Sequence, residues 1–468
     1  MPLQDVRRRL PIVDALPVPK NRSFSRRDLG PVPKPTIAVW EFTLMCDHRC
    51  LHCGPRAGHA RSDELTTDEA IALVHELADL GIGEVALIGG EAYLRDDFIL
   101  VIRAIRERGM TSSIVTGGWG MTPERCAAAK EAGLMVMSVS IDGLEAHHDH
   151  VRNKNGSYKG AFRAIANARA AGMRVGANTQ INALTVPDLA PLLDELTTAG
   201  IIAWQLQFTM VHGNGADHPE LILQPHMIPE LFEHLEVLAD RCRERGIRFL
   251  PGNNIGYFGP NEQKLRWMQK KGGHYSGCTA GLVTLGIESN GQIKSCPSLG
   301  GPTNLGGSWR EHGLRKLWEQ SPEVTYIRER TVEDLWGYCR DCYYADVCRA
   351  GCTATAEPLL GRPGNNPFCH HRALEMEKQG LRERIELVSV APDIPFANGL
   401  WQVVREPADA DERARTGPVV IERPRVSRLV ERLGPGYDVD PADYVVPKPT
   451  TPNETPVSSA VPTRKSAT

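Results

Sequence analysis

Between residues 36 and 252, short apolar runs alternate with amphipathic stretches of roughly 12–15 residues. This alternation is typical of βα units on a parallel sheet. The apolar runs predict strands at residues 36–43, 84–88, 112–115, 135–141, 174–181, 202–208 and 248–250. The stretches between them predict helices that begin near residue 67 and then span 97–108, 123–132, 158–171, 187–199 and 228–245. Six units and a seventh strand indicate an α/β fold, a partial (β/α)6 TIM-like barrel that is not closed.

The start of the first helix is marked by local chemistry. Thr66 and Glu69 have the spacing of a capping box, in which each side chain accepts a hydrogen bond from the other residue's backbone N–H. Ile71, Val74 and Leu77 follow at helical spacing. We therefore expect the helix to begin directly after Thr66 and to bury this apolar face.

Changes in composition divide the chain further. Segment 276–375 is short in helix and dense in cysteine, so we expect bound metal to stabilise its fold. The last residues are rich in Ser, Thr and Pro, which is typical of disorder. The predicted parts are an arm (1–35), the barrel (36–252), a bridging segment (253–275), the cysteine-rich domain (276–375), a C-terminal extension (376–446) and a disordered tail (447–468).

Charge and hydropathy exclude several partners. The chain has 54 Lys and Arg against 57 Asp and Glu, so no overall basic field indicates nucleic acid or a membrane surface. No apolar run is long enough to span a bilayer. The arginines at 7–9 are not followed by an apolar run, so they do not begin a secretory signal. The sequence predicts a soluble cytoplasmic protein.

Cysteine is the residue type that indicates chemistry. The chain has 12 cysteines, and ten of them fall in local groups, which leaves only Cys126 and Cys242 alone. A chain of 468 residues without a secretion signal keeps its thiols reduced, so the grouped cysteines are interpreted as metal ligands, not disulfides. The two isolated cysteines lie in helical patterns and are expected to be buried as small apolar side chains.

The first group, Cys46, Cys50 and Cys53, directly follows the first predicted strand. Parallel barrels place their reactive groups beyond the carboxyl ends of the strands. Three thiolates can hold three irons of a cubane cluster and leave the fourth iron open to a substrate. The alternative is a structural zinc site completed by His48 or His52.

This C-x3-C-x2-C spacing resembles the signature of the radical SAM superfamily, with His52 where that family often has an aromatic residue. The resemblance implies a [4Fe–4S] cluster, held by the three cysteines, that binds S-adenosyl-L-methionine. Gly89, Gly90 and Glu91 end the second strand and resemble the motif that binds the amino group of this cofactor. Ser140 and Arg152 resemble residues near its carboxylate; taken alone, the glutamate could be solvated and the arginine could form a surface ion pair.

Seven more cysteines lie between residues 278 and 369, more than one tetrahedral ion needs. Their spacing, with Gly291 expected in a hairpin before Cys296, resembles the SPASM extension of radical SAM enzymes, which binds two auxiliary [4Fe–4S] clusters. The resemblance assigns Cys278, Cys296 and Cys352 to the first auxiliary cluster and Cys339, Cys342, Cys348 and Cys369 to the second. The first cluster is thus left open to substrate or to a ligand other than cysteine. A pair of zinc knuckles is the alternative.

The combined resemblance implies a radical SAM/SPASM oxidoreductase, in which a 5′-deoxyadenosyl radical abstracts hydrogen from the substrate. Because SPASM enzymes are most often peptide (RiPP) maturases, the leading hypothesis is oxidative modification of a ribosomally synthesised peptide by crosslink, thioether or ring formation. This hypothesis implies a reductant such as flavodoxin or ferredoxin, and either a separate leader-recognition protein or docking of the substrate's leader on the barrel. Pro297, which follows Cys296, argues against sulfatase maturation because related sulfatase maturases have an acidic residue there.

Two other classes of function stay open. One is a radical SAM dehydrogenase or mutase that acts on a small-molecule metabolite, and the other is a metal-binding scaffold without enzymatic activity. The sequence assigns no residue to the substrate radical. His212 and Asn214 follow the sixth strand, but polar residues of loops usually face water.

Overall fold

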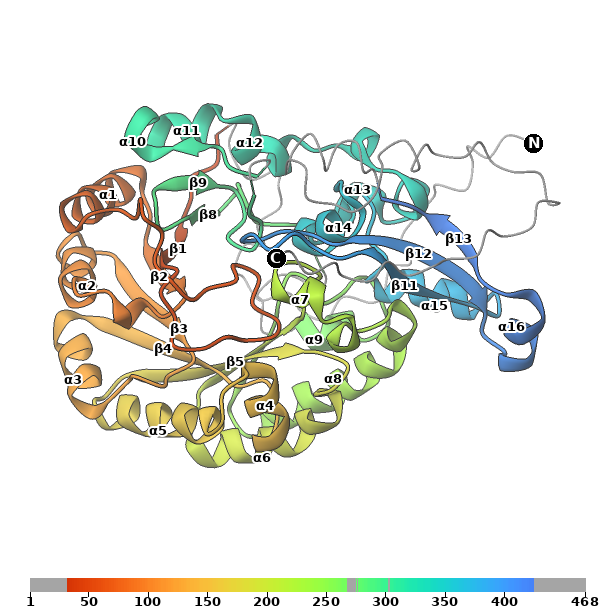
Figure 1. The fold of residues 1–468 in the computed structure, drawn as a ribbon, viewed down its shortest axis with the longest axis horizontal. Helices are drawn as coiled ribbons and strands as arrows, with labels where there is room; N and C mark the ends of the chain where they lie inside the picture. The colour runs from red at the N-terminus through yellow and green to blue at the C-terminus, as the bar shows by residue number, and fades with distance from the viewer. Residues whose placement is uncertain (1–31, 267–274, 276, 302–303, 425–468) are drawn as a thin grey trace, which may run out of the picture.

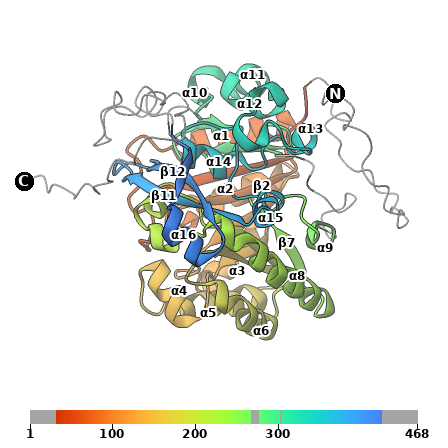
Figure 2. The same cartoon turned by 90° about the vertical axis from the view of Figure 1, so that its right-hand side faces the viewer.

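The computed structural model describes residues 32–266, 275, 277–301 and 304–424. Most of the predicted arm and all of the predicted tail (447–468) lie outside the described residues. A partial barrel with helices on its outer side forms one part of the molecule, and the cysteine-rich segment and a small antiparallel sheet lie beside it (Figures 1 and 2).

The barrel sheet confirms the predicted α/β fold. Seven strands run parallel and in chain order from β1 to β7. The sheet has two open ends, β7 at one and β10 at the other, so it is the partial barrel that the sequence predicts. The parallel strands are β1 (Ile37–Thr43), β2 (Glu84–Gly89), β3 (Thr111–Thr116), β4 (Leu134–Ser140), β5 (Arg174–Ile181), β6 (Ala203–Phe208) and β7 (Arg248–Pro251).

Helices alternate with the strands along the chain, and most of them lie on the outer side of the sheet in Figure 1. They are α1 (Thr67–Leu80), α2 (Phe98–Glu107), α3 (Pro123–Ala132), α4 (Glu145–Arg152), α5 (Ser157–Ala170), α6 (Leu189–Ala199), α7 (Asn214–Asp217), α8 (Ile228–Glu244) and α9 (Glu262–Arg266). The capping box of α1 is present, because Thr66 accepts from the N–H of Glu69 and its own N–H donates to the Glu69 carboxylate. Helix α4 is an addition to the elements predicted from the sequence.

Apolar side chains fill the space between strands and helices. Trp40 and Phe42 on β1 and Trp204 on β6 are almost fully buried. Cys126 and Cys242 belong to this core and have no exposed surface, which confirms their prediction as small buried side chains. The core therefore supports β1, whose carboxyl end leads into the first cysteine group.

The cysteine-rich segment begins by extending the barrel sheet. Strand β8 (Thr284–Ile287) pairs in parallel with β1, and β9 (Gln292–Lys294) and β10 (Gly307–Ser308) follow in antiparallel pairing. Gly291 lies in the β8–β9 hairpin with φ at +84°, which confirms the predicted turn. The helices after β10 are α10 (Trp309–His312), α11 (Leu314–Gln320), α12 (Pro322–Glu329), α13 (Ala345–Cys348), α14 (Thr353–Leu360) and α15 (His370–Glu377).

The C-terminal extension contains a sheet that the sequence pattern did not predict. Strands β11 (Leu381–Ser389), β12 (Leu400–Pro407) and β13 (Val419–Glu422) are antiparallel, with α16 (Ala410–Thr416) between the last two. In Figure 1 the end of the β11–β12 hairpin reaches the centre of the barrel, beside α7.

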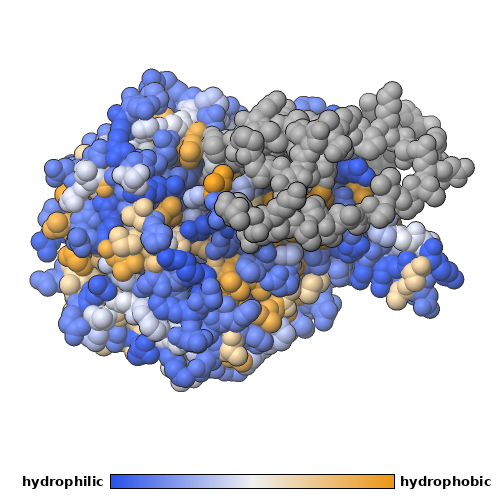
Figure 3. Space-filling model, in the orientation of Figure 1, coloured by the Kyte–Doolittle hydropathy of each residue, from blue (hydrophilic) through white to orange (hydrophobic). Residues whose placement is uncertain are grey.

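The surface is mixed in character. Hydrophilic residues dominate the face seen in Figure 3, and apolar residues are interspersed among them. None of the helices within the described ranges combines the length and the apolar character that a transmembrane span requires.

Candidate functional site

The first cysteine group lies in a loop of residues 44–58, called here the cysteine loop, at the carboxyl end of β1. The N–H of Gly58 donates to the carbonyl of Leu44 over 2.7 Å, which closes the base of the loop. The N–H of Leu51 donates to the carbonyl of Val151 over 2.8 Å. The loop is therefore a fixed element attached to α4, and Cys50 within it is buried.

The spacing of the ligand atoms separates the cluster and zinc interpretations. Four sulfurs around one tetrahedral zinc ion lie about 3.8 Å apart, given a Zn–S bond of about 2.3 Å. Within the described ranges, the only three ligand atoms that all lie within 4.8 Å of one another belong to Cys46, Asp47 and His48. No three cysteine sulfurs of the described residues thus all lie within 4.8 Å of one another, whereas a cubane binds each cysteine through a different iron.

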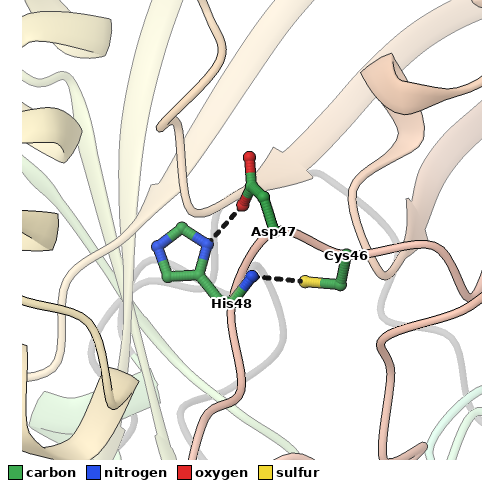
Figure 4. Close-up of side chains that lie close together, drawn as sticks. All are labelled: Cys46, Asp47 and His48. Carbon is green, nitrogen blue, oxygen red and sulfur yellow. Dashed lines mark hydrogen bonds and ion pairs between the residues drawn. The ribbon is translucent and has the colours of Figure 1, made fainter.

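Figure 4 shows the hydrogen bonds that Cys46, Asp47 and His48 make within the cysteine loop. The imidazole Nδ1 of His48 is 2.5 Å from Oδ1 of Asp47, so these two ligand atoms are engaged with each other. The sulfur of Cys46 lies on the other side and accepts from the backbone N–H of His48 over 3.4 Å. The three groups are hydrogen-bonded within the loop.

Each of the three sulfurs accepts a hydrogen bond from the protein. The backbone N–H of Ala57 donates to Cys53 over 3.3 Å, and Nη1 of Arg152 donates to Cys50 over 3.8 Å. Burial raises the pKa of Cys53 to about 12 and also raises the pKa of Cys46. The free thiols are therefore protonated, and binding iron must release their protons. This donor set fits three ligands of an iron–sulfur cluster.

Glu91 is buried beside the cysteine loop at the end of β2. Its carboxylate accepts from the hydroxyl of Thr116 over 2.5 Å and from the N–H of Gly117 over 2.6 Å. Burial raises the pKa of this carboxyl to about 8, in spite of these two hydrogen bonds. A cationic ligand would stabilise the ionised form of Glu91, so the site is suited to an ammonium group.

The two glycines before Glu91 serve the packing of the loop. A Cβ on Gly90 would lie 2.1 Å from the carbonyl oxygen of Met45, and one on Gly89 would lie 2.3 Å from that of Thr43. Gly89 also has φ at +127°, which favours glycine. Their small size allows the backbone of the cysteine loop to contact the end of β2.

Asp142, two residues after β4, joins two sides of the site. Its Oδ2 is 2.7 Å from Nε2 of His52 and 2.7 Å from Nη2 of Arg152. Burial alone would raise the pKa of Asp142, but the Arg152 and His52 charges outweigh burial and lower it. His52, the departure from the usual motif, is therefore a partner of Asp142. Ser140 is the last residue of β4.

A chain of hydrogen bonds that the sequence did not predict continues from Asp142. The N–H of Asp142 donates to Nδ1 of His148, so we assign the proton of this neutral imidazole to Nε2, 3.1 Å from the hydroxyl of Ser157. Ser157 then donates to Nε2 of His48 over 3.0 Å, and His48 donates from Nδ1 to Asp47. The chain ends where Tyr93 donates to Asp47 over 2.6 Å.

The position of His212 and Asn214 differs from that of ordinary loop residues. His212 is buried, and burial lowers its pKa to about 4. Asn214 donates from its amide side chain to the carbonyl of Cys50 and from its backbone to that of Cys53, each over 2.9 Å. Both residues therefore belong to the site and do not simply face water, and their place after a barrel strand was the signal in the sequence.

Cys278, Cys296 and Cys352 lie together in one buried cluster. The pKa of Cys296 is raised by burial first and then by the nearby Cys278 and Cys352. Tyr257 is part of the same cluster, and its hydroxyl accepts from the backbone N–H of Cys352 over 2.9 Å.

Cys339, Cys342, Cys348 and Cys369 line one cavity together. Its other walls include the aromatic rings of Tyr257, Phe258, Tyr344 and His371. Burial raises the pKa of Cys348, and the three other cysteines of the set raise it further. Tyr344 thus lines the cavity, whereas its neighbour Tyr343 is exposed.

Comparison with known proteins finds one matching family model and several relatives that are similar over most of the chain. Residues 40–191 match the family model of the radical SAM superfamily. The AdoMet-dependent heme synthase of Methanosarcina barkeri is 28% identical over 353 residues, which cover 72% of this chain and 97% of that protein. Mycofactocin maturase MftC of Mycobacterium tuberculosis is 27% identical over 362 residues, which cover 75% of this chain and 86% of that protein.

The crystal structure of Streptococcus suis SuiB bound to precursor peptide SuiA has a TM-score of 0.57 to this structure. The sequence identity is 16%, and the match covers 71% of this chain and 75% of that chain. At this identity the likeness shows a shared fold. The fold therefore extends over the barrel and beyond the residues of the family match.

Proposed function

We propose that the protein, whose residues 40–191 match the family model of the radical SAM superfamily, is a radical SAM enzyme that oxidatively modifies a ribosomally synthesised peptide. The observation that carries the radical chemistry is the cysteine loop. Its three sulfurs each accept a hydrogen bond, and no three sulfurs of the described residues are close enough together for one zinc ion. When bound there, a [4Fe–4S] cluster would supply the electron that cleaves S-adenosylmethionine to a 5′-deoxyadenosyl radical.

The chain's own residues would bind and orient the cofactor. Glu91 would accept hydrogen bonds from the cofactor's ammonium group. The two groups that donate to this buried carboxylate, the hydroxyl of Thr116 and the N–H of Gly117, are both uncharged. Arg152 would contribute positive charge near the carboxylate while it stays paired with Asp142. Ser140 would lie at the same edge of the sheet, at the carboxyl end of β4.

Two similar proteins support a peptide substrate. Mycofactocin maturase MftC is similar over 75% of the chain, and SuiB shares the fold and was crystallised with its precursor peptide. We propose a peptide of the same general class here, with a leader-recognition protein as a separate partner. A flavodoxin or ferredoxin would supply the electron.

The C-terminal cysteines support a SPASM assignment with two auxiliary [4Fe–4S] clusters. Cys278, Cys296 and Cys352 would hold the first, and Cys339, Cys342, Cys348 and Cys369 would hold the second. Support comes from the nearness of Cys278 and Cys352 to Cys296, both of which raise its pKa, and from the cavity that the four cysteines of the second set line together. The clusters would accept electrons from the substrate, which would make the net reaction an oxidation.

A second candidate is oxidation of a small molecule. The heme synthase of Methanosarcina barkeri, whose length is covered to 97%, carries this possibility. Such an enzyme would change the mass of a metabolite and would need no leader peptide. Mass spectrometry of cell extracts can therefore separate the two candidates, because one changes the mass of a peptide and the other that of a metabolite.

The test compares the intact protein with a variant in which Cys46, Cys50 and Cys53 are all alanine. After anaerobic reconstitution, the intact protein is expected to convert S-adenosylmethionine to 5′-deoxyadenosine, and the variant is expected to lose this activity. Cys126→Ala is the matched control, because this buried cysteine belongs to the barrel core and not to a ligand set. Equal cleavage by the triple variant would contradict the proposed site.

High-resolution mass spectrometry of cells that carry either form then identifies the substrate. A peptide that loses hydrogen mass only with the intact protein supports peptide maturation. A mass change confined to a small metabolite would replace the peptide proposal with the second candidate.

A further inference from the structure

Residues 391–398, called here the strap, connect β11 to β12 and lie on the cysteine loop. The backbone N–H of Phe396 donates to the carbonyl of Gly54 over 3.0 Å. The N–H of Gly213 donates to the carbonyl of Ala397 over 2.7 Å, and an antiparallel bridge joins His212 to Asn398. The strap is thus hydrogen-bonded both to the cysteine loop and to the segment after β6.

Arg56 is a second point of attachment. From within the cysteine loop, its guanidinium donates to the carbonyls of Ile394 and Pro392 over 3.1 and 3.3 Å. The same group pairs with Asp217 over 2.6 Å and donates to Asn214 over 2.8 Å. Because Asn214 also binds the carbonyls of Cys50 and Cys53, a continuous network leads from the strap to two of the cysteines.

The side chain of Phe396 fills the space that these backbone contacts enclose. Its ring stacks on His212 with centroids 6.0 Å apart and planes 13° apart. The ammonium of Lys294 lies 4.3 Å from the ring centroid, a cation–π distance. A Cβ on Gly300 would meet this ring at 2.1 Å, so Phe396 also contacts the segment that follows Cys296.

The backbone of Phe396 is held in an unfavourable conformation. Its φ is +57°, a region that a bulky residue rarely adopts. Such a conformation persists only when the surrounding contacts fix it, and it is most often found near functional sites. The ring is 5% exposed, so the contacts of its side chain and backbone account for this conformation.

We infer that Phe396 is a positioning residue of the radical site. It holds the strap closed over the Gly54 end of the cysteine loop and fixes that end against the segment following Cys296. This role rests on the proposed function, because it assumes that the loop carries the cluster. Without the ring, Gly54 and Arg56 would lose their cover, and solvent and small oxidants would reach the cluster more easily.

The test replaces Phe396 with glycine, which adopts a positive φ without strain and so preserves the backbone. Two probes are used on the reconstituted holoenzyme without a peptide. The first is a ferrous chelator, and the second is S-adenosylmethionine with dithionite. In Phe396→Gly, the chelator is expected to remove the iron of the loop about tenfold faster. Loss of residues that support metal ligands commonly lowers metal affinity by about this factor. Substrate-free formation of 5′-deoxyadenosine is expected to change by a similar factor.

Three controls separate positioning from general destabilisation. Phe396→Tyr keeps the ring and is expected to restore both rates. Ile394→Ala changes a 41% exposed side chain of the same strap and is expected to behave as the unchanged protein. The variant in which Cys46, Cys50 and Cys53 are alanine identifies the iron that does not belong to the loop. The melting temperature of Phe396→Gly should stay within a few degrees of that of the unchanged protein.

Unchanged rates in Phe396→Gly would overturn the inference. Hydrogen exchange of the unmodified holoenzyme provides a test that does not depend on the folding of a variant. The amides of Phe396 and Gly213 are expected to exchange slowly, because both are donors in the contacts of the strap. Fast exchange at both amides would also overturn the inference. A protein that shows slow exchange but does not cleave S-adenosylmethionine would instead contradict the proposed function.

Discussion

At the scale of single residues, the site depends on charges that are buried with a partner. Asp142 and Arg152 form such a pair beside Cys50, and both side chains are nearly inaccessible to water. A buried charge that loses its partner is far more costly than an exposed one, because water cannot replace the lost interaction. Substitutions at these positions should therefore act on stability as well as on the cofactor.

The first prediction concerns Asp142→Asn. The amide removes the negative charge and leaves Arg152 buried without its counterion, which should lower the free energy of unfolding by about 3–5 kcal/mol. Urea denaturation of the iron-free protein measures this loss. Asp79→Asn is the matched control, because Asp79 pairs with Arg108 at the surface and its loss should cost about 0–1 kcal/mol. Equal losses in the two variants would contradict the prediction.

The second prediction concerns Gly90→Ala. The new methyl group would lie 2.1 Å from the carbonyl oxygen of Met45, so the cysteine loop must move away from β2. Overpacking of this kind should lower the free energy of unfolding by about 1–3 kcal/mol and reduce cleavage of S-adenosylmethionine. In Gly83→Ala, directly before β2, the nearest atom is 3.7 Å away. That variant is expected to retain both properties, and a similar loss in it would show that the contact with Met45 is not the cause.

The sequence could indicate the ligands but not their partners. Cys46, Cys50 and Cys53 form a local pattern whose spacing alone identifies them. His52 and Asp142, in contrast, are 90 positions apart in the chain. Their contact depends on how β1 and β4 bring their carboxyl ends to one edge of the sheet, and no local pattern records that pairing. The same holds for Ser157, which lies between His48 of the cysteine loop and His148 of helix α4.

At the scale of elements, one arginine joins helix α15 to two strands of the C-terminal sheet. Arg372 on α15 pairs with Glu383 of β11 over 2.6 Å and with Glu422 of β13 over 3.0 Å. Its third contact is with Asn365, whose neighbour Asn366 donates a backbone N–H to Cys339. The sheet is thereby connected to the cysteine set around Cys339.

The third prediction concerns Arg372→Met. Glu422 would stay buried without this cation, whereas Glu383 would keep its pair with Arg405 over 2.7 Å, so the sheet should be destabilised by about 3 kcal/mol. Hydrogen exchange should become faster in β11 and β13 and stay unchanged in β2 and β3. Arg315→Met is the control, since Arg315 is exposed and pairs with Glu319 on the surface of α11. Unaltered exchange in β11 would argue against a central role for Arg372.

Periodicity explains which elements could be predicted. Strand β1 and helix α2 have regular apolar patterns, and their predicted bounds, 36–43 and 97–108, agree with the structure to within one residue at each end. Strand β11 could not be predicted from periodicity, because Glu383 occupies a buried position in it, where alternation would require an apolar residue. Helix α4 is mostly polar and its buried face includes His148 and Arg152, so its pattern also lacks the usual signal.

At the scale of the whole molecule, the two halves depend on different sources of stability. The barrel has a large apolar core, which also takes in residues of the cysteine-rich segment such as Leu285, Leu317 and Leu359, whereas most of the cysteines of that segment pack in two smaller clusters. Burial raises the pKa of the thiols in both C-terminal sets, among them Cys296 and Cys339. Binding of the proposed clusters would supply the energy that deprotonates them, and it would become part of the folding free energy.

The fourth prediction follows for removal of iron. A chelator should increase proteolysis and hydrogen exchange between residues 278 and 369 and leave the barrel helices α1 and α2 protected. The effect should reverse on anaerobic reconstitution. Equal loss of protection in α1 and in the cysteine-rich segment would indicate that the two parts unfold together and would contradict this division.

Strand β1 has neighbours on both sides that are far apart in the chain. Ile37 lies opposite Glu84 of β2 and also opposite Thr284 of β8. During protein synthesis, at about 5–20 residues per second, the roughly 240 residues from the end of β1 to the end of β8 take about 12–50 s to appear. For that time one edge of an apolar strand lacks its partner and can pair with another chain. The strand that leads into the cysteine loop is therefore the point at which newly made copies are most exposed to aggregation.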